Sequence, residues 1–144
     1  IPNVILNKQE IEQVFINLFV NAGHAMEEMQ NDKKRVIKVS VTHNNNEIIL
    51  EMTDNGCGMN EKTLNTIFDP FFTTKDTGRG TGLGLSICHG IIEKHRGTIT
   101  AKSSPGEGTT FKITLPLDPA KKDRRTEQSE KISGRLRKDD SLIL

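Results

Sequence analysis

Three polar side chains lie on one line of a segment whose pattern otherwise predicts a helix. Asn17, Asn21 and His24 occupy positions i, i+4 and i+7, which share one face of a helix. Asparagine is a mediocre helix former, and two amide oxygens in line can serve as ligands for a hard cation such as Mg²⁺. The alternative interpretation is an ordinary solvated polar face.

A second group, "DNGCGM", covers residues 54–59 directly after a predicted strand. Asp54 can accept a hydrogen bond from an exocyclic amine, and Gly56 and Gly58 would let a planar base lie against the backbone. On its own the stretch also fits an ordinary Asn-Gly turn.

The stretch "GRGTGLGLS", residues 78–86, alternates glycines with other residues before a helical pattern begins. Successive backbone N–H groups in a glycine-rich turn at a helix start form an anion-binding site. The spacing matches neither GxxxxGK[ST] nor GxGxxG, so the two common nucleotide loops are excluded. A merely flexible loop is the alternative. A fourth stretch, "PGEGTTF" at 105–111, predicts a hairpin turn by itself.

Two helices and two strand pairs must position these groups. Apolar residues recur every three or four positions over Asn7–Met29, and Asn7 followed by Glu10 is typical of a capping box. A second long helix is expected over Leu83–His95, with Gly97 as its C-terminal cap. Strands are expected over 37–41, 48–52, 98–103 and 109–116, and a loop with a short helix at 61–67 over 54–82. This order predicts a two-layer α/β (α+β) sandwich, with a mixed, mostly antiparallel sheet and helices on one face.

The composition is that of a globular domain. The chain has 144 residues, 33% apolar and 27% charged, which is enough for one core. No apolar run is long enough to span a membrane and no signal peptide is visible. We therefore expect a cytoplasmic location, with Cys57 and Cys88 as reduced thiols. The start at Ile1, within a pattern, suggests a fragment of a longer protein.

Charge is distributed unevenly along the chain. Residues 1–118 carry a net charge of −2 and residues 119–144 a net charge of +3. The apolar pattern stops after Pro116, so we expect a domain over 1–117 and a charged, disordered linker or tail over 118–144. A basic tail on a mildly acidic domain gives little reason to expect nucleic acid, and we predict no nucleic-acid partner.

Five stretches together are more specific than any one alone. "NLFVNAGHA", "DNGCGM", "FDPFF", "GRGTGLGLS" and "GEGTTF" stand in this order. They resemble the N, G1, F, G2 and G3 boxes of the ATP-binding catalytic domain of sensor histidine kinases. That domain belongs to a superfamily shared with DNA gyrase, the heat-shock chaperone ATPase and the mismatch-repair ATPase. The resemblance covers about residues 1–117 and implies a Bergerat-type ATP-binding fold with ATP and Mg²⁺ as cofactors.

The resemblance also implies a role for each matching residue. Asn21 would bind Mg²⁺, with Asn17 and His24 near the phosphates. Asp54 would recognise the adenine amino group, and Lys75, in the lid over the nucleotide, would complete a catalytic set with Asn17 and Asn21. The other implied nucleotide-binding residues are Gly56, Gly58, Phe71, Arg79, Gly80, Thr81, Gly82, Leu83, Gly84 and Thr109.

One position separates kinases from hydrolases in this superfamily. The hydrolases carry a glutamate, the base that activates water, four residues before the Mg²⁺-binding asparagine, and here that place is Asn17. An amide cannot act as a general base, so we expect slow hydrolysis and phosphoryl transfer to a histidine. The alternative is a stand-alone ATPase of the same fold that drives a conformational clamp.

The phosphoacceptor histidine is not expected in this sequence. In the family it lies on a separate helical dimerisation domain, and the contexts "GHA", "THN", "CHG" and "KHR" do not fit it. The implied partners are that domain, a cognate response regulator and a second copy in a full-length homodimer of a two-component system. Ile16 and Val20 lie off the main apolar stripe and are either a docking site for that domain or ordinary exposed residues. The ending "DDSLIL" fits either the first strand of a receiver domain or the end of a fragment.

Overall fold

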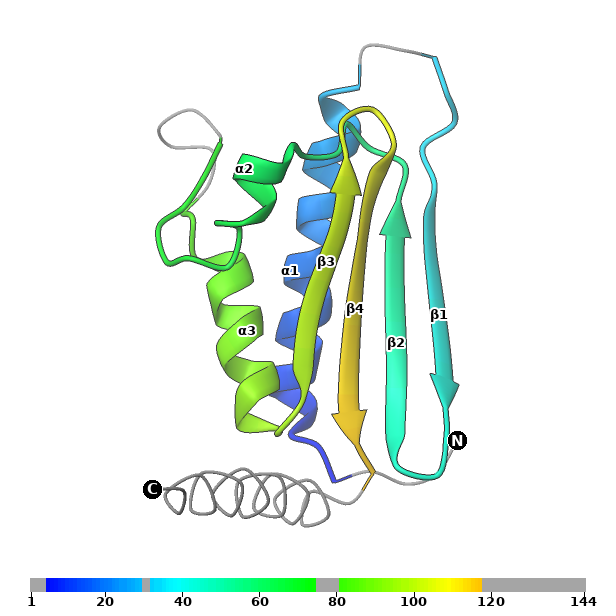
Figure 1. Cartoon of the computed structure of the whole chain (residues 1–144), viewed down its shortest axis with the longest axis vertical. Helices are drawn as coiled ribbons and strands as arrows, with labels where there is room; N and C mark the ends of the chain where they lie inside the picture. The colour runs from blue at the N-terminus through cyan, green and yellow to red at the C-terminus, as the bar shows by residue number, and fades with distance from the viewer. Residues whose placement is uncertain (1–4, 30–31, 75–80, 118–144) are drawn as a thin grey trace, which may run out of the picture.

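The structure is a computed structural model that describes residues 5–29, 32–74 and 81–117. Its elements in chain order are α1 (Lys8–Glu27), β1 (Ile37–His43), β2 (Glu47–Asp54), α2 (Glu61–Leu64), α3 (Gly84–Lys94), β3 (Thr98–Ser104) and β4 (Gly108–Pro116) (Figure 1). Every expected element is present, although α1 ends at Glu27 and the helical part of α2 stops at Leu64. The tail expected over 118–144 lies outside the described residues.

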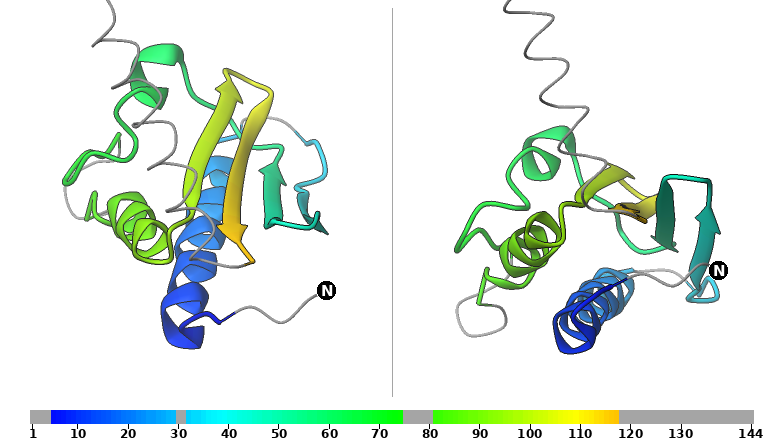
Figure 2. Two further views of the ribbon diagram at one scale, coloured as in Figure 1. Left: turned by 60° about the horizontal axis from the view of Figure 1, so that its bottom comes forward. Right: turned by 90° about the horizontal axis from the view of Figure 1, so that it is seen from below.

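The four strands form one sheet in the order β1-β2-β4-β3, and each neighbouring pair is antiparallel. Hairpins connect β1 to β2 and β3 to β4, and the pairing of β2 with β4 joins the two hairpins. Helices α1 and α3 lie together on one face of this sheet (Figures 1 and 2). The two-layer fold is confirmed, and no parallel pair of the kind a mixed sheet contains occurs among the described strands.

The core lies between the two long helices and the sheet. Paired residues of neighbouring strands point to the same face, and Met52 of β2 opposite Phe111 of β4 points toward the helices. The buried apolar residues are Val14, Leu18, Ala22, Met26, Met52, Ile67, Cys88, Ile92, Ile99, Phe111, Ile113 and Leu115. Burial of each large apolar side chain contributes about 1.5–3 kcal/mol, so this interface supplies most of the stability that positions the site.

Helix α1 begins at the predicted cap. The side chain of Asn7 accepts a hydrogen bond from the backbone N–H of Glu10 at 3.2 Å. In a complete capping box the Glu10 carboxylate would accept the N–H of Asn7, but here Nε2 of His95 accepts it at 3.1 Å. Glu10 instead pairs with Lys94. The cap therefore ties the start of α1 to the end of α3.

The C-terminal end of α3 differs from the prediction in its detail. Arg96, not Gly97, has the left-handed backbone, with φ of +57°. The N–H groups of Arg96 and Gly97 donate to the carbonyls of Glu93 and Ile92, which is a Schellman motif. Gly97 is needed for packing, because a Cβ there would lie 2.6 Å from the carbonyl oxygen of Thr114.

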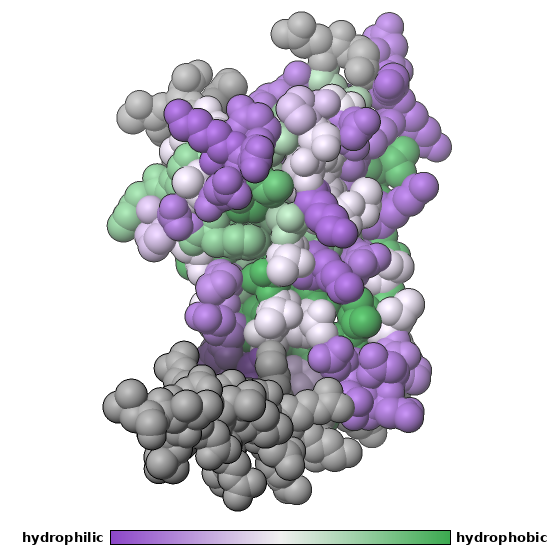
Figure 3. Space-filling view, in the orientation of Figure 1, coloured by the Kyte–Doolittle hydropathy of each residue, from purple (hydrophilic) through white to green (hydrophobic). Residues whose placement is uncertain are grey.

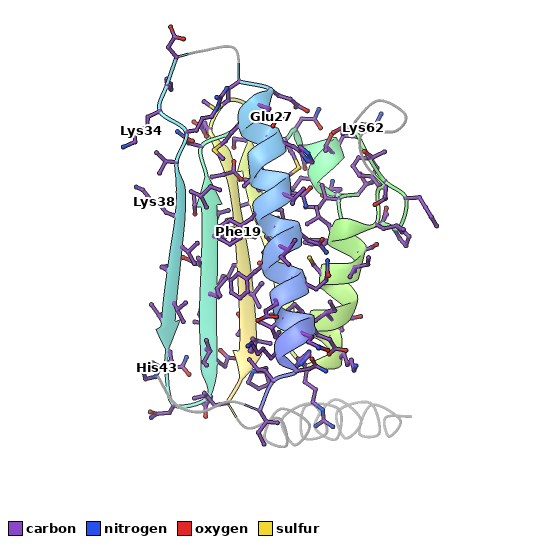
Figure 4. All side chains as sticks on the ribbon, turned by 180° about the vertical axis from the view of Figure 1, so that it is seen from behind. Phe19, Glu27, Lys34, Lys38, His43 and Lys62 are labelled. Atoms are coloured by element: carbon purple, nitrogen blue, oxygen red, sulfur yellow. The ribbon has the colours of Figure 1, made fainter. Side chains whose placement is uncertain are left out.

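The helices leave the inner face of β1 partly open. Phe19 projects from α1 beside the strands in Figure 4, yet its side chain is 44% exposed. Val39 and Val41 of β1 are exposed to a similar extent. The opposite face of the sheet is mainly polar (Figure 3), and the hydroxyls of Thr53 and Thr110 are hydrogen-bonded across it at 2.9 Å.

Candidate functional site

Two adjoining cavities of about 310 and 280 Å³ lie between α1, residues 57–74 and the start of α3. The first, the lid-side cavity, is bordered by Asn17, Phe72, Thr81, Gly82 and Gly84. The second, the sheet-side cavity, is bordered by Asp54, Cys57, Gly58, Thr109 and Phe111. Both are also lined by Asn21, His24, Met59, Thr63, Thr74 and Leu85, so they are two halves of one groove.

Asp54 is the buried charge of the sheet-side cavity. Asp54 is only 4% exposed, and one of its carboxylate oxygens accepts a hydrogen bond from the N–H of Gly56 at 2.8 Å. Burial raises the pKa of Asp54 above its usual value, and the backbone N–H groups of Gly56 and Thr109 partly oppose that shift. A buried carboxylate with unused acceptor capacity suits a ligand that brings its own N–H donors.

Two glycines allow the walls of this cavity to come together. Gly58 has φ of +67°, and a Cβ there would lie 2.0 Å from the carbonyl oxygen of Ser104. Gly108 has φ of +90°, and its Cβ would lie 2.0 Å from the carbonyl oxygen of Asp54. No L side chain fits at either position, so the loop after β2 and the turn before β4 touch through their backbones.

Gly56 lies against α1 rather than in the lining of the groove. It borders neither cavity. A Cβ at Gly56 would lie 2.7 Å from Cβ of Ala25, and the next N–H, of Cys57, donates to the Ala25 carbonyl at 2.9 Å. Gly56 therefore lets the loop pack against α1 and reaches the site only through its N–H on Asp54.

The polar line of α1 borders the groove. Asn21 and His24 border both cavities, and Asn17 borders the lid-side cavity. The amide nitrogen of Asn21 donates to the carbonyl of Asn17 at 2.9 Å, so the amide oxygen is the atom that Asn21 can offer to a cation. Asn17 donates to the carbonyl of Gly84 at 3.1 Å and accepts from Gln13 at 3.1 Å. Asn17 thus joins α1 to the first turn of α3.

The second half of the glycine-rich segment borders the site. Thr81 and Gly82 border the lid-side cavity, and the N–H of Leu83 donates to Oγ1 of Thr81 at 3.3 Å. Gly82 has φ of +67°, and a Cβ there would lie 2.5 Å from the carbonyl carbon of Phe71. Leu83 precedes α3 and borders neither cavity. Lys75, Arg79 and Gly80 lie outside the described residues.

Phe72, rather than Phe71, borders the groove. Phe71 has φ of +64° and is 76% exposed, because this backbone conformation turns its ring to solvent. Sequence reasoning also missed Met59, Thr63 and Leu85. Met59 and Leu85 lie within two of the recognised stretches, but neither was given a role there. Thr63, on the short α2, carries no sequence signal.

The two thiols differ in their access to the groove. Cys57 is half-buried beside the sheet-side cavity, and its Sγ donates to a carboxylate oxygen of Glu28 at 3.4 Å. Burial first, and then Glu28, raise the pKa of Cys57. Cys88 is fully buried, and burial raises its pKa to about 11. Both thiols stay protonated at neutral pH.

The groove does not contain a preformed metal cage. Within the described ranges, no group of three or more His, Cys, Asp or Glu side chains could hold a metal ion. Mg²⁺ is usually held by one or two protein oxygens together with substrate phosphates and water. The amide oxygen of Asn21 fits such a site, in which the nucleotide would supply the remaining ligands.

Comparison with known proteins shows the family to which the chain belongs. Residues 7–119 match the family described as histidine kinase-, DNA gyrase B- and HSP90-like ATPase. The chain belongs to this family. Sporulation kinase E of Bacillus subtilis is 37% identical over 89% of this chain and 16% of its own length. Sensor histidine kinase ZraS of Escherichia coli (strain K12) is 37% identical over 85% of this chain and 25% of its own length. This histidine kinase ATPase domain therefore spans a quarter or less of these sensor kinases.

Solved structures lead to the same family. The catalytic domain of histidine kinase ThkA is 34% identical, with a TM-score of 0.65 over 82% of this chain and 73% of that chain. The mycobacterial sensor histidine kinase MprB, 24% identical with a TM-score of 0.66 over 78% of this chain and 74% of its own, shares the fold. The similarity to ThkA extends the family assignment from sequence to three-dimensional structure.

Proposed function

We propose that this domain binds Mg-ATP in the groove and supplies the γ-phosphate to a histidine on a separate dimerisation domain. The observation that carries this proposal is the buried carboxylate of Asp54, at the end of a groove whose other end is formed by Asn17 and the start of α3. A nucleoside triphosphate requires a hydrogen-bond acceptor for its base at one end of the site. At the other end it requires an anion site for its phosphates, which a helix N-terminus provides.

The base would lie in the sheet-side cavity. Asp54 would accept from the exocyclic amine, and Gly58 and Thr109 would form the wall beside it. The buried environment strengthens this hydrogen bond, because water cannot compete for the carboxylate. Met59 and Leu85, which border both halves of the groove, would contact the base or the ribose through apolar surface.

The triphosphate would lie in the lid-side cavity. Asn21 would offer its amide oxygen to Mg²⁺, and the backbone of Gly82 and Gly84 would approach the phosphates with the positive end of α3 behind them. His24 would add its imidazole ring close to both halves. Lys75, Arg79 and Gly80 would complete the phosphate contacts.

Asn17 favours transfer over hydrolysis. Its side chain is an amide, and its nitrogen is occupied by the carbonyl of Gly84. It therefore cannot remove a proton from water, and bound ATP would persist until a histidine nitrogen arrives. Positioning and charge neutralisation carry most of phosphoryl transfer, which matches a groove that holds its ligand without a general base.

The whole kinase would need further domains. A dimerisation domain that carries the phosphoacceptor, a response regulator and a homodimeric assembly fit a domain that spans a quarter or less of its sensor-kinase relatives. Ile16, Val20 and Ile87 are 56%, 51% and 44% exposed, on α1 and α3, and would form the docking surface for the dimerisation domain.

Among residues 5–29, 32–74 and 81–117, no helix has the length and apolar content to cross a bilayer. We place the domain in the cytoplasm, where ATP is available.

Calorimetry with the isolated chain tests this proposal. We expect saturable Mg-ATP binding, a flat baseline afterwards, and no phosphohistidine on the chain. Sustained heat with release of phosphate would favour the stand-alone ATPase. A stoichiometric phosphohistidine signal would contradict the separate acceptor, and absence of any binding would contradict the nucleotide site.

A further inference from the structure

Ser103 of β3 is the centre of a small hydrogen-bond network behind the sheet-side cavity. Its hydroxyl donates to the carbonyl of Gly108 at 2.8 Å and accepts the backbone N–H of Met59 at 2.8 Å. It also lies 2.9 Å from the hydroxyl oxygen of Thr109. Ser103 itself borders neither cavity, whereas Thr109 and Met59 border the sheet-side cavity.

The number of protons in this network fixes its direction. A serine hydroxyl carries one proton, and that of Ser103 is used on the Gly108 carbonyl, which can only accept. The hydrogen bond between the two hydroxyls must therefore be donated by Thr109. The single hydroxyl proton of Thr109 then points at Ser103. The hydroxyl oxygen of Thr109 can therefore only accept a hydrogen bond from a ligand in the cavity.

The base end of the groove thus presents acceptors side by side. Thr109 lies opposite Asp54 in the pairing of β2 with β4, and its backbone N–H supports the Asp54 carboxylate. Both residues are about 95% buried, so water does not replace a missing donor there. An amino group at the 6-position of a purine can donate to both acceptors, whereas a carbonyl oxygen there can donate to neither, and only the ring N1–H remains as a donor for one of them.

We propose that Ser103 is a positioning residue that holds the Thr109 hydroxyl as an acceptor and so selects 6-aminopurine over 6-oxopurine nucleotides. This inference rests on the proposed function, because it needs the base in the sheet-side cavity. Without the hydroxyl of Ser103, the proton of Thr109 is free to rotate toward the cavity. Thr109 can then donate to a carbonyl oxygen, and the discrimination weakens.

The test compares the affinities of Mg-ATP and Mg-ITP, which differ in the group at the 6-position. We expect Ser103→Ala to lower the ratio of ATP affinity to ITP affinity about fivefold, since one neutral hydrogen bond changes partner. Ser104→Ala is the matched control, because Ser104 is the next residue and the last one of β3, and it is exposed. A merely structural role would weaken both nucleotides equally and leave the ratio unchanged, which would overturn the proposal.

A second variant keeps the test decisive if Ser103→Ala folds poorly. Thr109→Val removes the acceptor oxygen at nearly constant volume, so we expect ATP to bind more weakly and ITP more tightly. Equal weakening of both would contradict an acceptor-only hydroxyl. With Val at position 109, the substitution Ser103→Ala should leave the ratio unchanged, because Ser103 acts through Thr109.

The failures of the two proposals are distinguishable. If the unsubstituted chain binds neither nucleotide, the proposed function fails and the inference about Ser103 falls with it. If the chain binds Mg-ATP and Mg-ITP equally well, the groove is still a nucleotide site, and only the role of Ser103 is wrong.

Discussion

Replacing Asp54 by Asn should separate nucleotide affinity from stability, because the two respond with opposite signs. The substitution keeps the shape of the side chain and removes its charge. A charge-assisted hydrogen bond contributes about 1.5–3 kcal/mol, so Mg-ATP affinity should fall about 10- to 150-fold. The upper part of this range is favoured, since Asp54 is only 4% exposed and an Asn would also turn one N–H toward the ligand's amine or the backbone donors.

The free chain should not lose stability in the same way. Burial raises the pKa of Asp54 in the folded state above the unfolded value of about 3.9, so the folded state disfavours the charged carboxylate. The contribution of Asp54 to the free energy of unfolding is therefore highest below that pH. It falls as the pH rises from the unfolded to the folded pKa, and it stays low above the folded pKa. At neutral pH, Asp54→Asn should leave the melting temperature unchanged or raise it.

Two measurements on the same samples decide the matter. Calorimetry at neutral pH gives the affinity, and thermal unfolding from pH 4 to 8 gives the stability difference between the two proteins. That difference should shrink toward the acid end, where the folded state of the unsubstituted chain takes up its proton at Asp54. Glu107→Gln, at the exposed turn between β3 and β4, is the control and should change neither quantity. A large loss of stability with unchanged affinity would show that Asp54 is a structural residue and would refute the reasoning.

Two further predictions concern the lid-side wall and the thiols. Gly82→Ala should weaken Mg-ATP binding on the order of tenfold in calorimetry. The left-handed backbone at this position costs an L residue about 1–2 kcal/mol, and the added Cβ would overlap the backbone of Phe71. Gly90→Ala, on α3 with nothing within 4 Å of the added Cβ, should bind normally, and equal losses in both would contradict this account. Alkylation followed by mass spectrometry should modify Cys57 slowly at neutral pH and more slowly with saturating Mg-ATP, whereas Cys88 should react only after unfolding. Faster labelling of Cys57 with nucleotide would place the base elsewhere.

The fold could be predicted from sequence because its signals are local and mutually consistent. The apolar stripe of α1 specified the face that became buried at Val14 and Leu18, and the alternation in β2 specified the face that carries Met52. The strand order could not be predicted in the same way. It depends on the pairing of β2 with β4, which are separated by some fifty residues.

Contacts between distant segments also explain the errors within the site. The capping box at Asn7 was half wrong, because His95 competes for the N–H that Glu10 was expected to bind. Gly56 was assigned to the wall of the base pocket, since its close approach to Ala25 of α1 is invisible in sequence. Backbone conformation at Phe71 decides which of two adjacent rings faces the groove, and no pattern of residue types encodes a positive φ at phenylalanine.

The walls of the two halves of the groove differ in how firmly the rest of the fold holds them. The sheet-side cavity is held by the antiparallel register of β2 and β4 and by backbone contacts at Gly58 and Gly108, so it cannot change shape without breaking the sheet. The lid-side cavity has one firm wall, where Asn17 joins α1 to α3, and another that packs through Gly82 on Phe71. Substitutions at the sheet side should therefore change stability and affinity together unless, as at Asp54, they remove a burial penalty. Substitutions at exposed lid-side residues should change affinity more than stability. Under the proposed function, a domain built in this way would recognise its base in a preformed pocket and leave the phosphate end adjustable, which suits a donor that must present a phosphoryl group to a separate acceptor.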